Sequence, residues 1–259
     1  MVSYVERLFS LAGQTAVITG AAGHLCGCMA AGIAQAGANV VLFDRDADAV
    51  SRGVAAIQSN GGRAIGAVGD VRDRTVHERA LAEALAKFGS VDTLINGAGI
   101  NAPTPFLEIT EDEWNKIIGV HLTGTLLGCQ VFGAQMLQQG RGSIMNMSSA
   151  SSGPPLSRAF TYSVAKSGVK NLTQNLAREW AHQGVRVNAL RPGFFPTEWS
   201  REHFIDEDRG RAILGHTPMG RYGEPEELLG AVIWLASPAA SFVTGAEIQV
   251  DGGFTCMTI

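Results

Sequence analysis

Short runs of apolar and β-branched residues alternate along this chain with longer stretches in which apolar residues recur every three or four positions. The first run, Thr15–Thr19, is followed by a helical pattern that puts Leu25, Met29 and Ile33 on one face. A second run, Asn39–Phe43, comes next. Strands that are apolar throughout are typical of parallel sheets covered on both faces. The start of the chain therefore predicts a strand–helix–strand unit.

The same alternation continues to the end of the chain. Further strands are predicted at residues 64–68, 91–95, 142–147, 185–190 and 247–250. Helical patterns cover residues 47–57, 76–88, 111–139, 162–180 and 226–236. Regular alternation is typical of α/β proteins, in which crossover helices join parallel strands. We expect a single domain, residues 1–259, with a doubly wound parallel sheet of about seven strands and helices on both faces.

The segment from residue 194 to about residue 220 departs from this regularity. Its apolar periodicity is weak, its charge is higher, and Pro196 and Pro218 bracket it. Long loops in a compact domain are commonly covers of an active site. We expect a mobile substrate lid, in which Trp199, Arg201 and His203 either contact substrate or lie in solvent.

Composition limits the functions that the chain can have. Hydrophobic residues make up 46% and charged residues 17% of the 259, enough for a large core without disulfides. The net charge of −4 argues against nucleic acid as a partner. The chain has no run of 18 apolar residues, and its first residues lack the pattern of a signal peptide. We therefore expect a cytoplasmic protein that does not bind a membrane.

Neither the four cysteines nor the six histidines follow a metal-binding pattern. The cysteines form no CxxC pair and the histidines form no HExxH motif. We therefore expect free thiols and no metal site.

A glycine-rich turn follows the first strand. Gly20, Gly23 and Gly27 lie between strand and helix, and Asp44 ends the next strand, 24 residues after Gly20. Glycines let the backbone approach a pyrophosphate at a helix N-terminus, and the acid can hold ribose hydroxyls. The unit predicts dinucleotide binding, with NAD favoured because a 2′-phosphate would meet the Asp44 carboxylate. Arg45 is the counter-argument, because an arginine there can pair with that phosphate.

A tyrosine and a lysine lie four residues apart at the start of the helical pattern 162–180. Tyr162 and Lys166 would share one helix face, and an ammonium group beside a phenol lowers the phenol's pKa. Ser149 follows the strand 142–147, so its hydroxyl can reach the same sheet edge. The three residues predict acid–base chemistry at Tyr162. The simpler alternative is a surface tyrosine with a lysine nearby.

Together with further segments, these motifs resemble the short-chain dehydrogenase/reductase family over essentially the whole chain. The matching segments are Thr19-Gly20 with its glycine loop, Asp70-Val71, Asn96-Gly97-Ala98-Gly99, Ser149, Tyr162 with Lys166, and Pro192-Gly193 with Thr197. The stretch Pro192–Glu198 is most similar to members that oxidise sugars, polyols and sugar acids, such as fructuronate (mannonate) and gluconate dehydrogenases. The resemblance implies a Rossmann-type fold, an NAD cofactor and a homotetramer.

The resemblance also implies a role for each matching position. Tyr162 would exchange a proton with the substrate oxygen, Ser149 would hydrogen-bond that oxygen, and Lys166 would hold the nicotinamide ribose. The positions expected to bind cofactor are Gly20, Gly23, His24, Leu25, Asp44, Arg45, Asp70, Val71, Asn96, Ala98, Gly99, Tyr162, Lys166, Pro192, Gly193 and Thr197. The positions expected near the substrate are Asn101, Ser151, Arg158, Glu198 and Trp199. Of these, Arg158 either pairs with an anionic group or stays in solvent.

The chain departs from the family pattern in three ways. In the TGxxxGxG loop, His24 and Cys26 replace the last two glycines. His121 stands where the family often has a catalytic asparagine, so it either relays protons or is a structural histidine bonded to backbone. Gly97 replaces the second residue of an Asn-Asn pair.

The apolar content of the helix 111–139 adds to the expectation of an oligomer. Leu126, Leu127, Val131, Phe132 and Met136 are more than one buried face requires. Surplus apolar surface usually marks an interface between copies.

The sequence thus predicts an NAD-dependent oxidoreductase that transfers a hydride between nicotinamide and a secondary alcohol or ketone of a small polyhydroxy substrate. Sugars, polyols and sugar acids fit this description. One alternative is an epimerase or dehydratase that uses NAD transiently, although such relatives usually have a larger substrate region. The other is a catalytically silent nucleotide-binding protein, against which Ser149, Tyr162 and Lys166 argue.

Overall fold

The computed structural model describes residues 3–258, with the backbone alone at residues 198 and 199. Its strands are β1 (Thr15–Thr19), β2 (Asn39–Asp44), β3 (Arg63–Val68), β4 (Thr93–Asn96), β5 (Gly142–Met147), β6 (Val185–Pro192) and β7 (Glu247–Val250). Its α-helices are α1 (Tyr4–Phe9), α2 (His24–Gln35), α3 (Ala47–Ser59), α4 (Arg74–Phe88), α5 (Glu111–Ile118), α6 (Gly124–Gln139), α7 (Phe160–Trp180), α8 (Glu198–His203), α9 (Glu207–Gly215) and α10 (Leu229–Ala236).

The seven strands form one parallel sheet in the order β3-β2-β1-β4-β5-β6-β7. The predicted doubly wound sheet is therefore confirmed. The winding reverses between β1 and β4, because the chain moves outward to β3 and then returns to the other side of β1. In open α/β sheets the crevice at such a reversal, beyond the carboxyl ends of the strands, is where ligands bind.

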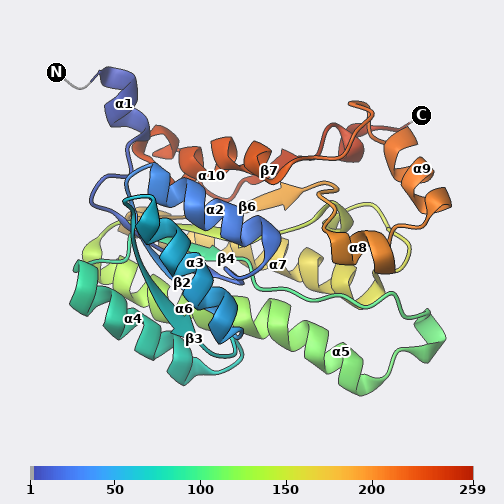
Figure 1. Ribbon diagram of the computed structural model, residues 1–259, viewed down its shortest axis with the longest axis horizontal. Coiled ribbons are helices and arrows are strands. Elements are labelled where there is room, and N and C mark those ends of the chain that lie inside the picture. The colour runs from blue at the N-terminus through green and yellow to red at the C-terminus, as the bar shows by residue number, and fades with distance from the viewer. Residues whose placement is uncertain (1–2, 259) are drawn as a thin grey trace.

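Helices cover the two faces of the sheet in separate layers (Figure 1). Helices α2, α3 and α10 pack on one face, and α4, α6 and α7 pack on the other. Strands β1 and β4 are buried at every position, which explains why their sequences are apolar or β-branched up to Asn96 at the end of β4.

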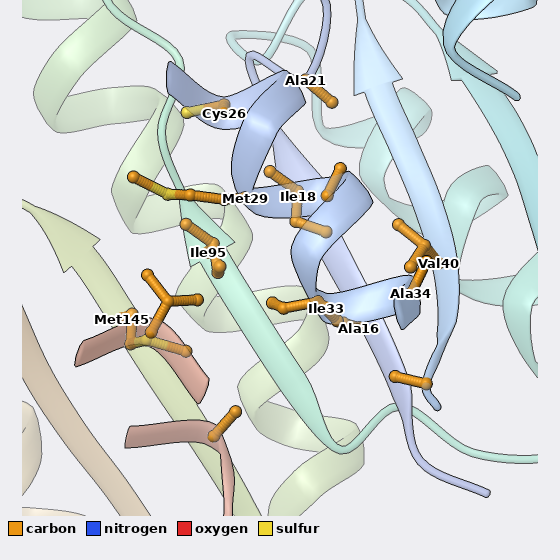
Figure 2. Packing of buried hydrophobic residues seen from close by; sticks show 14 of the residues in the cluster. Ala16, Ile18, Ala21, Cys26, Met29, Ile33, Ala34, Val40, Ile95 and Met145 are labelled. Carbon is orange, nitrogen blue, oxygen red and sulfur yellow. The ribbon is translucent and has the colours of Figure 1, made fainter. Parts of the chain in front are cut away.

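Figure 2 shows how the first layer contacts the sheet. Met29 and Ile33 of α2 are fully buried and lie against Ile18 and Ile95 of the two central strands. Cys26 lies on the same helix at its N-terminal end, where the core meets the ligand-binding edge. Core packing thus fixes the position of the α2 N-terminus relative to β1 and β4.

Three elements differ from the sequence predictions. The helix expected at residues 111–139 is continuous but contains a π-helical segment, Gly119–Thr123, between α5 and α6. The helix expected from residue 226 begins as a 3₁₀ turn, Pro225–Leu228. Helices α8 and α9 lie in the segment 194–220, for which weak periodicity had predicted a loop.

Within residues 3–258, one helical run, Glu111–Gln139, has the length and mean hydropathy (1.5) that would allow a helix to cross a membrane. In the structure, 56% of its apolar window is buried. A core helix of a soluble protein passes the same test, so the run is weak evidence for a membrane span.

Candidate functional site

A cleft of about 1140 Å³ lies beyond the carboxyl ends of β1, β2, β4, β5 and β6. Most of the positions predicted from the sequence line it. They are Gly20, Gly23, His24, Leu25, Asp44, Arg45, Asp70, Val71, Ala98, Gly99, Asn101, His121, Ser149, Tyr162, Lys166, Pro192, Gly193 and Thr197. Segments far apart in the chain therefore contribute to one site.

The glycine turn forms one wall of the cleft. Gly20 has φ +73°, and a Cβ there would lie 2.8 Å from the backbone of Ala98, so the turn requires glycine. Helix α2 begins at His24, and its N-cap, Gly23, supplies no side-chain cap. The first amides of the helix are thus left for an anion in the cleft, where the helix dipole favours negative charge.

His24 and Cys26, which stand where the family pattern has glycine, differ in their exposure to solvent. His24 is exposed in the first turn of α2 and lines the cleft. Cys26 is 6% exposed, and burial raises the pKa of its thiol to about 12, so it stays protonated. Cys26 occupies the space beside Gly97, where no Cβ would fit.

The carboxylate of Asp44 is held at the end of β2 by backbone amides. The Ala22 N–H donates to Oδ2 at 3.0 Å, and the Arg45 N–H donates to Oδ1 at 2.7 Å. Nearby, Arg72 makes a two-point hydrogen bond with Asp70, which holds the pKa of that carboxyl below its usual range. This end of the cleft therefore combines fixed carboxylates with two arginines.

Tyr162, Ser149 and Lys166 come together at another wall of the cleft. Lys166 is 4% exposed, donates from Nζ to the Met147 carbonyl at 2.5 Å, and lies 5.5 Å from the centre of the Tyr162 ring. Burial lowers the pKa of Lys166 to about 8. The arrangement is that of an acid–base group with a hydroxyl and a cation beside it.

The expected lowering of the Tyr162 pKa is wrong for this structure. Burial of the phenol raises its pKa, and the hydrogen bond with Ser149 only partly offsets this. The ammonium of Lys166 lies 5.5 Å from the centre of the phenol ring and is not among the causes of the pKa shift. At neutral pH the phenol of Tyr162 therefore keeps its proton.

His121 is a buried, neutral histidine bonded to backbone. Its Nε2 lies 2.7 Å from the Ile100 carbonyl oxygen and 3.1 Å from the Ile100 nitrogen. Burial, together with the charge of Lys166, lowers the pKa of His121 to about 3. Of the two alternatives from the sequence, the backbone-bonded histidine fits these contacts, because the Nε2 atom is engaged by the Ile100 backbone. Its ring packs edge-on against Tyr162, with centroids 5.1 Å apart.

Three predicted positions do not meet the cleft as expected. Asn96 is turned into the protein, where its Nδ2 donates to Asn146 at 2.8 Å. Ser151 is buried, and its backbone and side chain donate to Ser149 Oγ at 3.2 and 3.1 Å. Arg158 pairs with Asp206 at 2.8 Å, so this guanidinium is already bound by a residue of the expected lid. The side chains predicted at Glu198 and Trp199 lie outside the described part of the chain.

The sequence prediction missed part of the cleft wall. Asp112, Glu113 and Lys116 of α5 line it, as does Arg72. For the three α5 residues, the available signal was the run of polar residues at the start of the helical pattern 111–139. In residues 3–258 no group of three or more histidine, cysteine, aspartate or glutamate side chains could hold a metal ion.

These walls fit a nicotinamide dinucleotide. The cleft is at least as large as common ligand pockets, it has an uncapped helix N-terminus beside a glycine turn, and it has a fixed carboxylate at the end of β2. The first two features suit a pyrophosphate and the third suits a ribose.

Comparison with known proteins agrees with this geometry. A family model described as enoyl-(acyl carrier protein) reductase matches residues 20–255. The chain is 39% identical to a galactitol 2-dehydrogenase (L-tagatose-forming) of Cereibacter sphaeroides, covering 96% of this chain and 98% of that protein. It is 36% identical to a gluconate 5-dehydrogenase of Gluconobacter oxydans, covering 96% and 97%.

Solved structures give the same result. A gluconate 5-dehydrogenase from Burkholderia cenocepacia, in complex with NADP and tartrate, superposes with a TM-score of 0.94 at 33% identity, covering 98% of this chain and 100% of that one. A protein provisionally named D-mannonate oxidoreductase, from Haemophilus influenza with bound NAD, superposes with a TM-score of 0.92 at 32% identity, covering 98% and 99%. From its fold, its cleft and these matches, the chain belongs to the short-chain dehydrogenase/reductase family of oxidoreductases.

Proposed function

We propose that this protein is an NAD-dependent dehydrogenase that oxidises a secondary alcohol of a sugar acid or polyol, or reduces the corresponding ketone. The observation that carries the proposal is the convergence of Tyr162, Ser149 and Lys166 on a cleft whose other wall is the glycine turn with Asp44. The relatives named for gluconate and galactitol support the substrate class.

The proposed chemistry divides between cofactor and protein. When bound, the nicotinamide accepts or donates the hydride at the substrate carbon. Tyr162 exchanges the proton of the substrate oxygen, and the Ser149 hydroxyl holds that oxygen by a hydrogen bond. Because burial keeps Tyr162 protonated, it is ready to donate to a ketone. Lys166, buried between the Met147 carbonyl and the Tyr162 ring, holds positive charge beside the phenol.

The cofactor preference rests on Asp44. Its carboxylate is fixed by the Ala22 and Arg45 amides, so it cannot swing away from a ligand at the end of β2. A 2′-phosphate would bring about −1.5 to −2 charges towards it, judging from phosphate monoesters. Arg45 is exposed and can turn into solvent. We therefore propose NAD rather than NADP, although relatives in solved structures hold either.

The test is a substrate panel with the purified full-length protein. Gluconate, mannonate, galactitol and a simple secondary alcohol are supplied with NAD or with NADP at equal concentration, and reduced nicotinamide is followed by absorbance. We expect turnover of at least one sugar acid or polyol with NAD, and turnover at least about 100-fold slower with Tyr162→Phe. No reduction of either cofactor with any substrate, while NAD binds, would contradict the proposal.

A further inference from the structure

A buried ion pair lies behind the segment that carries Ser149. Glu247, on edge strand β7, accepts from Arg191 Nη1 at 3.2 Å and from Lys170 Nζ at 3.1 Å, both at Oε2. The Arg191 side chain is 6% exposed and that of Glu247 is 11% exposed. Because water hardly reaches these two side chains, their charges are stabilised by protein partners, and this fixes the positions of both side chains.

The other carboxylate oxygen of Glu247 binds the serine segment directly. Ser148 Oγ donates to Oε1 at 2.7 Å, and Ser152 Oγ donates to the same atom at 2.9 Å. Ser148 precedes Ser149, the N-cap of the 3₁₀ turn Ala150–Ser152, and Ser152 ends that turn. One carboxylate oxygen therefore joins the residue before Ser149 to the last residue of the turn.

Arg191 adds a third connection. Its Nη2 donates to the Ala150 carbonyl at 3.2 Å, on the residue directly after Ser149. A Cβ at Gly153 would approach Nη2 to 2.6 Å, so the chain passes close to the guanidinium. Residues 148, 150 and 152 are thus bound to the Arg191–Glu247 pair, and Ser149 between them is left facing Tyr162.

We propose that Glu247, with Arg191, is a positioning residue that sets the Ser149 hydroxyl for reaction. Glu247 does not line the cleft in the described residues and acts only through the segment 148–152. A displacement of about 1 Å in a reacting group can cost about 100-fold in rate, so a fixed backbone on both sides of Ser149 has a direct kinetic effect. The inference rests on the function proposed for Ser149.

The test is a double-mutant cycle in the full-length protein, with the panel substrate that gives turnover. Glu247→Gln keeps the shape of the side chain but removes its charge, and we expect kcat to fall about 10- to 100-fold. NAD affinity, measured by fluorescence titration, should change less than about twofold. The same substitution is then made in the Ser149→Ala protein, whose turnover is measured at high enzyme concentration. There it should change kcat less than about threefold, because the hydroxyl that Glu247 positions is absent.

Two further variants separate positioning from folding. Ser152→Ala removes one hydrogen bond and leaves the Arg191–Glu247 pair intact, so it should fold normally and lower kcat about three- to tenfold. Glu179→Gln makes the same chemical change on the exposed end of α7 and should leave kcat unchanged. Thermal unfolding confirms that each variant is folded.

The outcomes distinguish the proposals. Equal losses from Glu247→Gln in the wild-type and Ser149→Ala backgrounds, or no loss at all, would overturn the positioning role. Wild-type turnover in Ser149→Ala itself would instead refute the role of the serine, and with it the positioning role. Loss from Ser149→Ala together with a coupled loss from Glu247→Gln is the result that we expect.

Discussion

Tyr162 is the residue on which the proposed reaction depends. Tyr162→Phe keeps the ring that packs against His121 but removes the hydroxyl that is proposed to exchange the proton. We expect kcat to fall at least about 100-fold, in line with the usual contribution of a general acid. NAD binding, measured by titration, should be little changed. Turnover close to wild type would exclude Tyr162 as the acid–base group.

Asp44 should set the choice between NAD and NADP. At about 4 Å and an effective dielectric of about 20, each pair of like charges costs on the order of 4 kcal/mol. Solvent and salt should reduce this to about 2–4 kcal/mol, or roughly 30- to 1000-fold in affinity. Asp44→Ser should therefore reduce the preference for NAD over NADP, chiefly by improving kcat/KM for NADP. If wild-type kcat/KM for NADP equals or exceeds that for NAD, then Arg45 sets the choice.

His121 should make the folded protein sensitive to acid. Its pKa is about 3 in the folded protein against an ordinary value of 6.5. Between these values the unfolded chain binds a proton that the folded protein excludes, so stability falls as pH falls, by up to about 1.4 kcal/mol per pH unit. His121→Asn should lose less stability than wild type between about pH 6.5 and pH 4.5, measured by urea unfolding.

The control for this experiment is His182→Asn, which changes an exposed histidine. It should follow the acid response of the wild type. If the stability of the His121→Asn protein falls as steeply with pH as that of the wild type, then protonation of the buried imidazole does not destabilise the folded protein.

At the scale of elements, α9 and the loop before α7 are joined by two arginines, which we call the latch. Arg158 pairs with Asp206 at 2.8 Å, and Arg209 donates to the side chain and carbonyl of Ser157 at 2.7 and 2.8 Å. Arg158 has φ +58°, an uncommon conformation outside glycine. We propose that the segment 194–220 is a lid over the substrate end of the cleft and that the latch holds it.

Breaking the latch should weaken the binding of charged and neutral substrates equally. Arg158→Ala removes a pair that is 44% and 49% exposed, so we expect KM for substrate to rise about two- to fivefold. Arg211→Ala, which breaks pairs within α9 only, is the matched control. A rise in KM for anionic substrates alone would instead mean that Arg158 contacts the substrate directly.

The sequence predicted some elements better than others for identifiable reasons. Strands β1 and β4 are buried on both faces, so their composition alone indicated them. Helices α8 and α9 are short and make polar contacts, and their apolar period is therefore weak. The π-helical turn at His121 leaves no pattern in the sequence, because it depends on backbone hydrogen bonds.

Individual site residues were harder to assign than the site itself. The motifs predicted which strand ends meet, but they could not give the direction of a side chain at a strand end. Asn96 closes β4 and faces Asn146 rather than the cleft, because neighbouring strand positions point to opposite faces. Arg158 and Ser148 bind Asp206 and Glu247, and both of these partners are distant from them in sequence.

At the scale of the whole molecule, we propose a homotetramer. The predicted apolar surplus of α6 is smaller than expected, because Val131, Phe132 and Met136 are buried within one chain and only Leu126 is clearly exposed. Further exposed apolar side chains on α5, on α7 and just before α5 include Trp114, Phe160, Val164, Phe106 and Leu107. Two of them, Phe106 and Phe160, are in ring contact. Exposed apolar surface of this kind usually marks an interface.

Light scattering of the full-length protein at micromolar concentration should give about four times the chain mass of 27.3 kDa. Val164→Glu puts a charge on this surface and should shift the mass towards smaller species. The control is Glu179→Lys, which changes the charge of an exposed residue elsewhere on α7 and should leave the mass unchanged. Lys170 is unsuitable as a control position because its ammonium pairs with Glu247. A mass near that of one chain for wild type would refute the tetramer.

The position of Glu247 has a consequence for synthesis of the protein. Strand β7 follows every other strand in chain order, yet its first residue holds Ser148 and Ser152. A nascent chain on the ribosome can pair β1 to β6 before residue 247 has emerged from the exit tunnel. If Glu247 positions Ser149, such a chain would bind nucleotide but would catalyse only slowly. Full activity would then begin only when the last strand has joined the sheet.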